Sequence, residues 1–275
     1  MKYSLLALLF FLGACSSKNY GDELYRLQMA SHGKDVMWVP TKLDVAHQML
    51  KMAEVTESDI VYDLGSGDGI ISIEAARAFG ARAFGIEYNP DLVALSQRNA
   101  IRSGVSERAS FRRGDIFVED FSAATVLTLY LGENLNTRLM PKILDMRPGT
   151  RVVSNTFRMD TWIPDREMRF NSGEVAFLWI VPAKADGIWE IRGDSSRFAA
   201  KLRIRQKKQF FDATLEFAGQ RGAAIENGKI TGDQITFEFR DEQKKRNHFI
   251  GTIDGSLITG SLNGEVKISG VRLSN

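Results

Sequence analysis

The seven residues Asp-Leu-Gly-Ser-Gly-Asp-Gly at positions 63–69 follow the apolar run Ile-Val-Tyr at 60–62 and precede an alanine-rich stretch at 70–79. This order predicts a buried strand, a tight glycine turn and a helix. Glycine lets the backbone lie against a ligand, and the first turn of the following helix offers unpaired N–H groups. Because position 70 is isoleucine, the spacing departs from the G-x-G-x-x-G of dinucleotide sites. We therefore expect a ligand-binding turn of another kind.

Strands and helices alternate on both sides of this turn. Thr41 is a candidate cap for a helix that runs to about Glu54, with Asp44 in its first turn. The hydrophobic pattern predicts further strands at residues 82–87, 110–113, 125–130, 151–155 and 174–181, and further helices at 70–79, at 90–102 and up to 148–149. Short connections between alternating elements predict a parallel sheet covered by helices on both faces. The expected fold class is α/β, a doubly wound Rossmann-like sheet over residues 34–184.

The sequence changes character after Ala185-Asp186-Gly187, where helix signals end. Residues 200–205 alternate apolar and basic side chains, as a half-buried strand does. Asn227-Gly228, Asp254-Gly255 and Asn263-Gly264 are expected to form type I′ hairpin turns, which need positive φ at both central residues. Residues 187–275 are therefore expected to form a small antiparallel all-β domain of seven or eight strands, either a sheet or a barrel.

The composition excludes some classes of partner. The chain of 275 residues has 36 basic and 34 acidic side chains, a net charge of +2, so no strong field favours nucleic acid. One cysteine and three widely spaced histidines give no metal-ligand spacing, so no metal is expected. A length of 275 residues is comfortable for two domains with their own cores.

A carboxylate side chain stands at or just after the end of each of three successive predicted strands. Asp63 precedes the glycine turn, Glu87 ends the second strand, and Asp115 follows the third. Ligands of such sheets bind at this edge. Asp63 suits the cationic amino group of a methionine moiety, and Glu87 can accept from both ribose hydroxyls. Asp115 can accept from an adenine amine while the N–H of Ile116 donates to the ring. The residues therefore predict a site for S-adenosylmethionine, with its turn supplied by Gly65, Ser66, Gly67 and Gly69.

These motifs together resemble class I S-adenosylmethionine-dependent methyltransferases. The stretches at 35–41, 62–69 and 152–157 more closely resemble the lysine methyltransferases of mitochondria that act on ATP synthase c-subunit and adenine nucleotide translocase, with their bacterial relatives. The resemblance covers about residues 34–182. It implies cofactor contacts from the glycine turn and the three acids, and places Thr41 and the segment 128–131 near the methyl group.

The function expected from this resemblance is N-methylation of a lysine in a protein substrate. A lysine acceptor must lose its proton before it accepts a methyl group, and desolvation in a narrow pocket would lower its pKa. Tyr130, just past the fourth strand, is the candidate that shapes the acceptor channel; packing under the sheet edge is the alternative. No Asn/Asp-Pro-Pro-aromatic stretch follows that strand, which weighs against an adenine-N6 nucleic-acid methylase.

The first 15 residues have the pattern of a bacterial lipoprotein signal. Lys2 precedes the apolar run at 5–12, which is too short to span a bilayer and suits a signal peptide. Leu-Gly-Ala-Cys at 12–15 resembles a lipobox, in which Cys15 would carry the lipid anchor. Residues 16–33 would then be a tether. Serine after the cysteine favours the outer membrane, with the protein facing the periplasm.

A periplasmic location conflicts with S-adenosylmethionine, which is made in the cytoplasm. Three alternatives stay open: a different adenosyl ligand, a lipid-anchored binding module with a vestigial or non-catalytic site, or a cytoplasmic enzyme translated from Met29. A dehydrogenase is a more distant hypothesis. We keep the enzyme first because the glycine turn and all three acids are intact.

Overall fold

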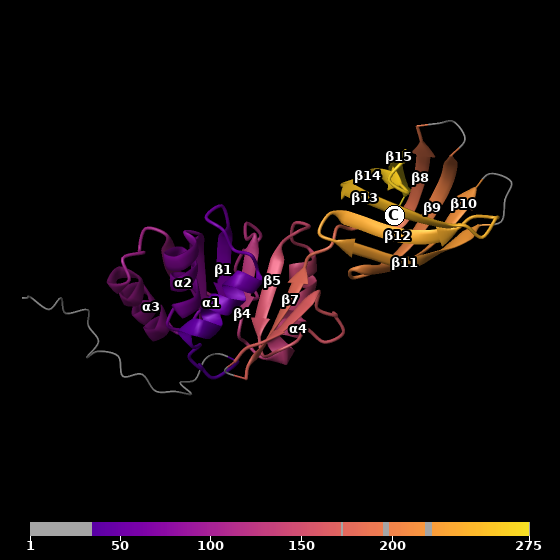
Figure 1. The fold of residues 1–275 in the computed structure, drawn as a ribbon. Helices are drawn as coiled ribbons and strands as arrows, with labels where there is room; N and C mark the ends of the chain where they lie inside the picture. The colour runs from indigo at the N-terminus through magenta and orange to yellow at the C-terminus, as the bar shows by residue number, and fades with distance from the viewer. Residues whose placement is uncertain (1–34, 172, 195–197, 218–221, 275) are drawn as a thin grey trace, which may run out of the picture.

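The computed structural model describes residues 35–171, 173–194, 198–217 and 222–274, which form an α/β unit followed by a β-barrel (Figure 1). The lipobox with Cys15, the tether at 16–33 and the alternative start at Met29 lie outside these residues. Within the described ranges, no helix combines the length and the apolar character needed to cross a bilayer.

The α/β unit is built on a seven-stranded sheet with the order β3-β2-β1-β4-β5-β7-β6. Its strands are β1 (Ile60–Leu64), β2 (Arg82–Glu87), β3 (Ala109–Arg113), β4 (Val126–Leu129), β5 (Arg151–Asn155), β6 (Arg166–Arg169) and β7 (Val175–Ile180). The first five strands are parallel, but β7 runs antiparallel to β5 and to β6. The expected parallel sheet is therefore confirmed for β1–β5, whereas β7 and β6 add an antiparallel edge that was not expected. Since β6 ends at Arg169 and β7 begins at Val175, the connection is short, and so short a link joins only antiparallel neighbours.

Helices cover both faces of this sheet. The helices are α1 (Leu43–Met52), α2 (Ile70–Phe79), α3 (Pro90–Arg102) and α4 (Glu133–Leu144). The first three contribute to one apolar core and α4 to the other. In β7, Ala176 and Leu178 point to the first core while Phe177 and Trp179 point to the second. This alternation follows from the two-residue period of a strand buried on both sides.

Two helix boundaries differ from expectation. Thr41 does not cap α1: the cap position is Lys42 and no side chain accepts there, while Thr41 lies two residues ahead of the helix. Helix α4 ends at Leu144, before the expected 148–149, and contains Pro141. By contrast, α3 starts at the residue that the sequence predicts, Pro90. Asn89 Oδ1 accepts from the backbone N of Asp91 at 2.9 Å, with proline in the first turn.

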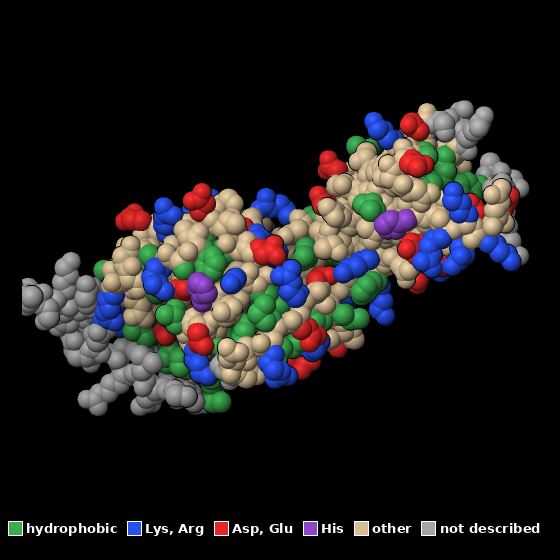
Figure 2. Space-filling view, in the orientation of Figure 1, with side chains coloured by type: hydrophobic (Ala, Val, Ile, Leu, Met, Phe, Trp, Pro, Cys, Tyr) green, Lys and Arg blue, Asp and Glu red, His purple; other side chains and the backbone are tan. Residues whose placement is uncertain are grey.

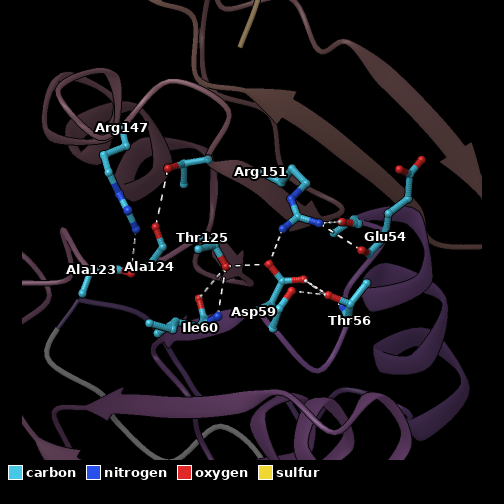
Figure 3. Close-up of polar contacts among 12 residues, drawn as sticks. Glu54, Thr56, Asp59, Ile60, Ala123, Ala124, Thr125, Arg147 and Arg151 are labelled. Atoms are coloured by element: carbon cyan, nitrogen blue, oxygen red, sulfur yellow. Dashed lines mark hydrogen bonds and ion pairs between the residues drawn. The ribbon is translucent and has the colours of Figure 1, made fainter. Parts of the chain in front are cut away.

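A polar network fixes the edge of the sheet where β1, β4 and β5 begin (Figure 3). Asp59 pairs with Arg151, and its carboxylate also accepts from the Thr125 hydroxyl at 2.7 Å and the Thr56 backbone N at 2.8 Å. Arg151 also donates to the Ala53 carbonyl at 2.8 Å. Although burial alone acts to raise the pKa of Asp59, the hydrogen bonds and the guanidinium together lower it. The network ties the end of α1 to three strands.

The C-terminal unit is a closed barrel of eight antiparallel strands. They are β8 (Gly187–Gly193), β9 (Ala199–Lys207), β10 (Phe210–Phe217), β11 (Ala223–Thr231), β12 (Gln234–Arg240), β13 (Arg246–Asp254), β14 (Leu257–Leu262) and β15 (Val266–Ser274). Closure leaves no unpaired sheet edge in this described unit. Aromatic side chains fill the interior: the rings of Phe237 and Phe249 stack at 4.8 Å, and Trp189 is fully buried.

The three expected hairpin turns have three outcomes. Asn263 and Gly264 both have positive φ between β14 and β15, as a type I′ turn requires. The turn expected at Asp254-Gly255 lies one residue later, between β13 and β14, with positive φ at Gly255. Asn227-Gly228 is not a turn. It lies inside β11, where the register with β12 shifts between Glu226 and Lys229, so its positive φ serves a β-bulge.

The barrel contacts the α/β unit beside the start of β5. Gly232, in the β11–β12 turn, packs against Gly149 and accepts from the backbone N of Ala183 at 2.7 Å. Lys229 Nζ lies 3.2 Å from Oδ1 of the nearly buried Asp165. Since β1–β5 are parallel, this junction lies at the opposite edge of the sheet from their carboxyl ends. On the face drawn in Figure 2, acidic and basic side chains are interspersed over both units.

Candidate functional site

A cleft of about 840 Å³, including its open mouth, lies at the carboxyl ends of β1–β4. It is lined by the residues Asp35, Val36, Met37, Trp38, Val39, Thr41, Asp63, Gly65, Ser66, Gly67, Asp68, Ile70, Ile71, Glu87, Tyr88, Leu92, Gly114, Asp115, Ile116, Tyr130, Leu131 and Leu135. A volume of this order accommodates a ligand of nucleoside size. The three strand-end acids that the sequence singled out therefore share one cavity.

The glycine turn between β1 and α2 forms the floor of the cleft. Gly65 and Gly67 both have positive φ, and a Cβ at Gly67 would lie 2.4 Å from Trp38 Nε1. Only glycine satisfies both the conformation and the close approach. Gly69 was expected to contact the ligand but does not line the cleft; it caps α2 in the left-handed conformation. Ser66 also lines the cleft, although most of its surface is buried.

Asp63 is buried at the end of β1. Its Oδ1 accepts a hydrogen bond of 2.7 Å from the hydroxyl of Thr128, on the neighbouring strand β4. Burial raises the pKa of Asp63 to about 7; the Thr128 hydrogen bond opposes the rise, and the charges of Asp68 and Glu87 add to it. Because its pKa lies near neutral pH, the Asp63 carboxyl ionises most readily when a cation enters the cleft.

Glu87 connects the end of β2 to the glycine turn. Its Oε2 accepts from the backbone N of Gly67 at 2.9 Å, and its Oε1 accepts from the backbone N of Asn89 at 2.8 Å. Each carboxylate oxygen keeps a second lone pair for a ligand hydroxyl. The side chain therefore shapes the turn and faces the cavity at once.

Asp115 follows β3 and opens a tight turn. Its Oδ1 accepts from the backbone N of Phe117 at 3.0 Å, and both Asp115 and Ile116 line the cleft. This local bond holds the carboxylate at the sheet edge.

The cleft is electronegative. Asp35 and Asp68 join the three strand-end acids on its wall, and among the described lining residues none is lysine or arginine. Burial raises the pKa of Asp68 as well. Such a surface attracts a cationic ligand and repels phosphate. Among the residues that the structure describes, no group of three or more His, Cys, Asp or Glu side chains is arranged to hold a metal ion.

Tyr130 forms the wall beyond β4, with Leu131 beside it. The ring of Phe157 stacks on Tyr130 with centroids 5.9 Å apart and planes at 28°. Thr41 also lines the cleft, as expected, whereas Leu129 of the segment 128–131 is buried in the α4 core instead.

Trp38, Leu131 and Phe157 were not identified individually from the sequence. Trp38 and Leu131 contact the glycine turn from distant parts of the chain, and no local sequence pattern predicts that contact. The only signals for them were the resemblance of the stretches at 35–41 and 152–157 and the role near the methyl group that this resemblance implies for the segment 128–131.

Comparison with known proteins gives consistent matches. The family model of the ANTKMT methyltransferase domain matches residues 63–166. A protein-lysine N-methyltransferase of Saccharolobus islandicus is 39% identical over 156 residues, which are 55% of this chain and 97% of that protein. A lysine N-methyltransferase of the ATP synthase c-subunit from Caenorhabditis elegans is 35% identical over 103 residues, 36% of this chain and 54% of that protein. The chain thus spans about half the length of this animal relative.

One solved structure is similar in sequence and fold. It is an RNA methyltransferase from Salinibacter ruber in complex with S-adenosyl-L-homocysteine, 47% identical, with a TM-score of 0.52. The match covers 54% of this chain and 96% of that chain. Both the Salinibacter ruber protein and the archaeal relative are therefore matched almost whole by little more than half of this chain.

Proposed function

Because this chain belongs to the family of class I S-adenosylmethionine-dependent methyltransferases that includes the archaeal protein-lysine N-methyltransferase, we propose that it methylates the Nζ atom of a lysine in a protein. The observation that carries the proposal is the single cleft in which Asp63, Glu87 and Asp115 meet an aromatic wall. S-adenosylmethionine supplies the methyl group from its sulfonium centre.

The side chains of the cleft fit this cofactor. Asp63 is placed to attract its cationic amino group, and Glu87 to accept from its ribose hydroxyls. Asp115 and the backbone N of Ile116 suit the adenine edge. These roles use carboxylates as acceptors and need no cation from the protein, which matches the electronegative lining.

The wall that Tyr130 forms beyond β4 suits an amine acceptor. Tyr130, Leu131 and Leu135 line this part of the cleft. Desolvation by the apolar side chains of this wall acts to lower the lysine pKa, which is near 10.4 in water, while the carboxylates elsewhere in the cleft act to raise it. Holding the neutral amine in line with the methyl group then supplies much of the rate acceleration.

Methylation of RNA is the second candidate, favoured by the 47% identity to the Salinibacter ruber protein. Five carboxylates and no lysine or arginine among the described lining residues make the cleft a poor place for a phosphate backbone. We therefore rank the protein amine first. A binding module with a vestigial site is not favoured, because the glycine turn and the acids keep a complete cleft.

The test uses the full chain, tritiated S-adenosylmethionine and two acceptor pools, total protein and total RNA from the source cells. Label in protein that is recovered as methyllysine after acid hydrolysis supports the proposal. Label confined to RNA would establish the second candidate. A chain that binds the cofactor, seen as a raised melting temperature, yet labels neither pool would restore the binding module. Glu87→Ala serves as the inactive control.

We also propose that Cys15 carries lipid and anchors the protein to a membrane, with the outer membrane favoured. The support is the short apolar run at 5–12 followed by Leu-Gly-Ala-Cys. Intact-mass analysis of the protein purified from membranes is expected to give a chain that starts at acylated Cys15. Cys15→Ser should move the protein to the soluble fraction. A chain that starts at Met29 would contradict the anchor and indicate a cytoplasmic enzyme.

A further inference from the structure

We propose that Asn136 is a positioning residue for methyl transfer, which fixes Phe157 against Tyr130 and so sets the wall of the acceptor channel. The inference rests on the proposed function, because it assigns the Tyr130 side of the cleft to the acceptor. Asn136 does not line the cleft and has no accessible surface. It acts through the loop that follows β5.

The amide of Asn136 reaches from α4 to that loop. Its Nδ2 lies 3.0 Å from Ser154 Oγ, 3.2 Å from the Phe157 carbonyl and 3.4 Å from the Arg158 carbonyl. The buried Asn136 side chain thus contacts both the end of β5 and the loop that follows it. Replacing Asn136 is expected to cost stability, because the buried carbonyl groups of the loop would lose their hydrogen-bond donor.

The loop is also strained at the residue before Phe157. Thr156 has a φ of 65°, which is unusual for a β-branched residue. It lies at the centre of a three-residue turn in which the Phe157 backbone N donates to the Asn155 carbonyl at 2.7 Å. The backbone N of Thr156 donates to the Val175 carbonyl, also at 2.7 Å. Strain of this kind persists only where surrounding contacts enforce it, and it concentrates at functional sites.

The strained turn places one side chain beside the cleft. Phe157 is half-buried, and its ring stacks on Tyr130, which lines the cleft. Relaxing the turn would withdraw this ring and free Tyr130 to rotate. Because displacements of about 1 Å can cost on the order of 100-fold in rate, the wall needs a fixed support.

The experiment compares Asn136→Ala, Phe157→Leu and the double variant with the wild type. Initial rates of tritium transfer are measured at limiting amounts of a total protein extract, so they report kcat/KM. Affinity for S-adenosylmethionine is measured by calorimetry, and hydrogen exchange of residues 155–158 by mass spectrometry. The matched control is Asn247→Ala, which removes another buried amide, one bound to the Lys245 carbonyl and to Asn263 in the barrel.

We expect Asn136→Ala to lower the rate at least about tenfold, to change cofactor affinity less than about threefold and to speed exchange at 155–158. The double variant should be no slower than the slower single variant, because both changes remove the same support. Asn247→Ala should keep the wild-type rate. The proposal would be overturned if the rate losses of the two single variants multiplied in the double variant. It would also be overturned if Asn136→Ala had the same rate as the control. If the wild type labels no protein, the acceptor assignment fails. Unchanged hydrogen exchange in Asn136→Ala would separately refute the proposal that Asn136 fixes the loop at 155–158.

Discussion

The hydroxyl of Thr128 donates to the carboxylate of Asp63 at 2.7 Å, although the two residues are 65 positions apart. Parallel pairing of β1 with β4 brings them together beneath the cleft. Burial raises the pKa of Asp63 to about 7, and this hydrogen bond limits the rise. The protonation of the carboxyl at neutral pH therefore depends on a side chain that does not itself line the cleft.

Cofactor affinity is expected to weaken as the pH falls through about 7. If only the ionised Asp63 attracts the cationic cofactor, affinity drops by up to about tenfold for each pH unit below its pKa. Thr128→Val should move this midpoint to higher pH, because the bond that favours the carboxylate is gone. Calorimetry with S-adenosylmethionine from about pH 6 to 8.5 measures both effects. Asp63→Asn is the control: it should bind weakly with no midpoint near 7.

Glu87→Gln should bind the cofactor nearly as poorly as Glu87→Ala. Both oxygens of Glu87 accept from backbone N–H groups, of Gly67 and Asn89. Glutamine keeps one acceptor and turns its NH₂ toward the other donor, so the turn loses a bond and gains a repulsion. We expect each variant to lose at least about tenfold in affinity, a change of about 1.4 kcal/mol or more. A Gln variant with wild-type affinity would contradict this dual role.

Asp59→Asn should destabilise the protein by about 1–3 kcal/mol, because Arg151 and the Thr125 hydroxyl lose a charged acceptor. The pKa of Asp59 is lowered in the folded state, so its contribution is present above the ordinary value near 3.8 and is lost as the pH falls through the folded value. Urea unfolding at about pH 7 and about pH 3 is expected to show a smaller difference between variant and wild type at the lower pH. Cofactor affinity at neutral pH should stay unchanged, since the network lies at the opposite sheet edge.

Lys229→Ala should weaken the junction between the two units. It leaves the nearly buried Oδ1 of Asp165 without its cation, while Oδ2 still accepts from the backbone N of Ile180 at 2.9 Å. We expect a cost of about 1–3 kcal/mol, and thermal unfolding that separates into two transitions. Lys201→Ala, on the outer face of the barrel, is the exposed comparison. A single unchanged transition in Lys229→Ala would show that the junction does not depend on this pair.

The elements that local chemistry specifies were predicted well. Helices α2 and α3 have the expected bounds, since Gly80 stops one and Asn89-Pro90 starts the other. The strand-end argument required that Asp63, Glu87 and Asp115 share a cleft, and they do. A parallel sheet brings strand ends to one edge whatever the intervening sequence, so this part of the site needed no knowledge of packing.

The remainder depends on contacts between distant segments. The reversal of β7 follows from a short hairpin whose first strand, β6, is exposed and carries no apolar period. Asn227-Gly228 has turn chemistry, but its neighbours continue to pair on both sides, and a bulge uses the same positive φ. Asn136 and Phe157 meet only because α4 packs beneath the end of β5, a relation that no local pattern encodes.

The position of the barrel has a consequence for how the two units can vary. Its attachment beside Gly149 and Ala183 lies at the sheet edge opposite the cleft, and none of the described residues that line the cleft belongs to the barrel. Changes on the barrel surface therefore leave the described walls of the cleft intact.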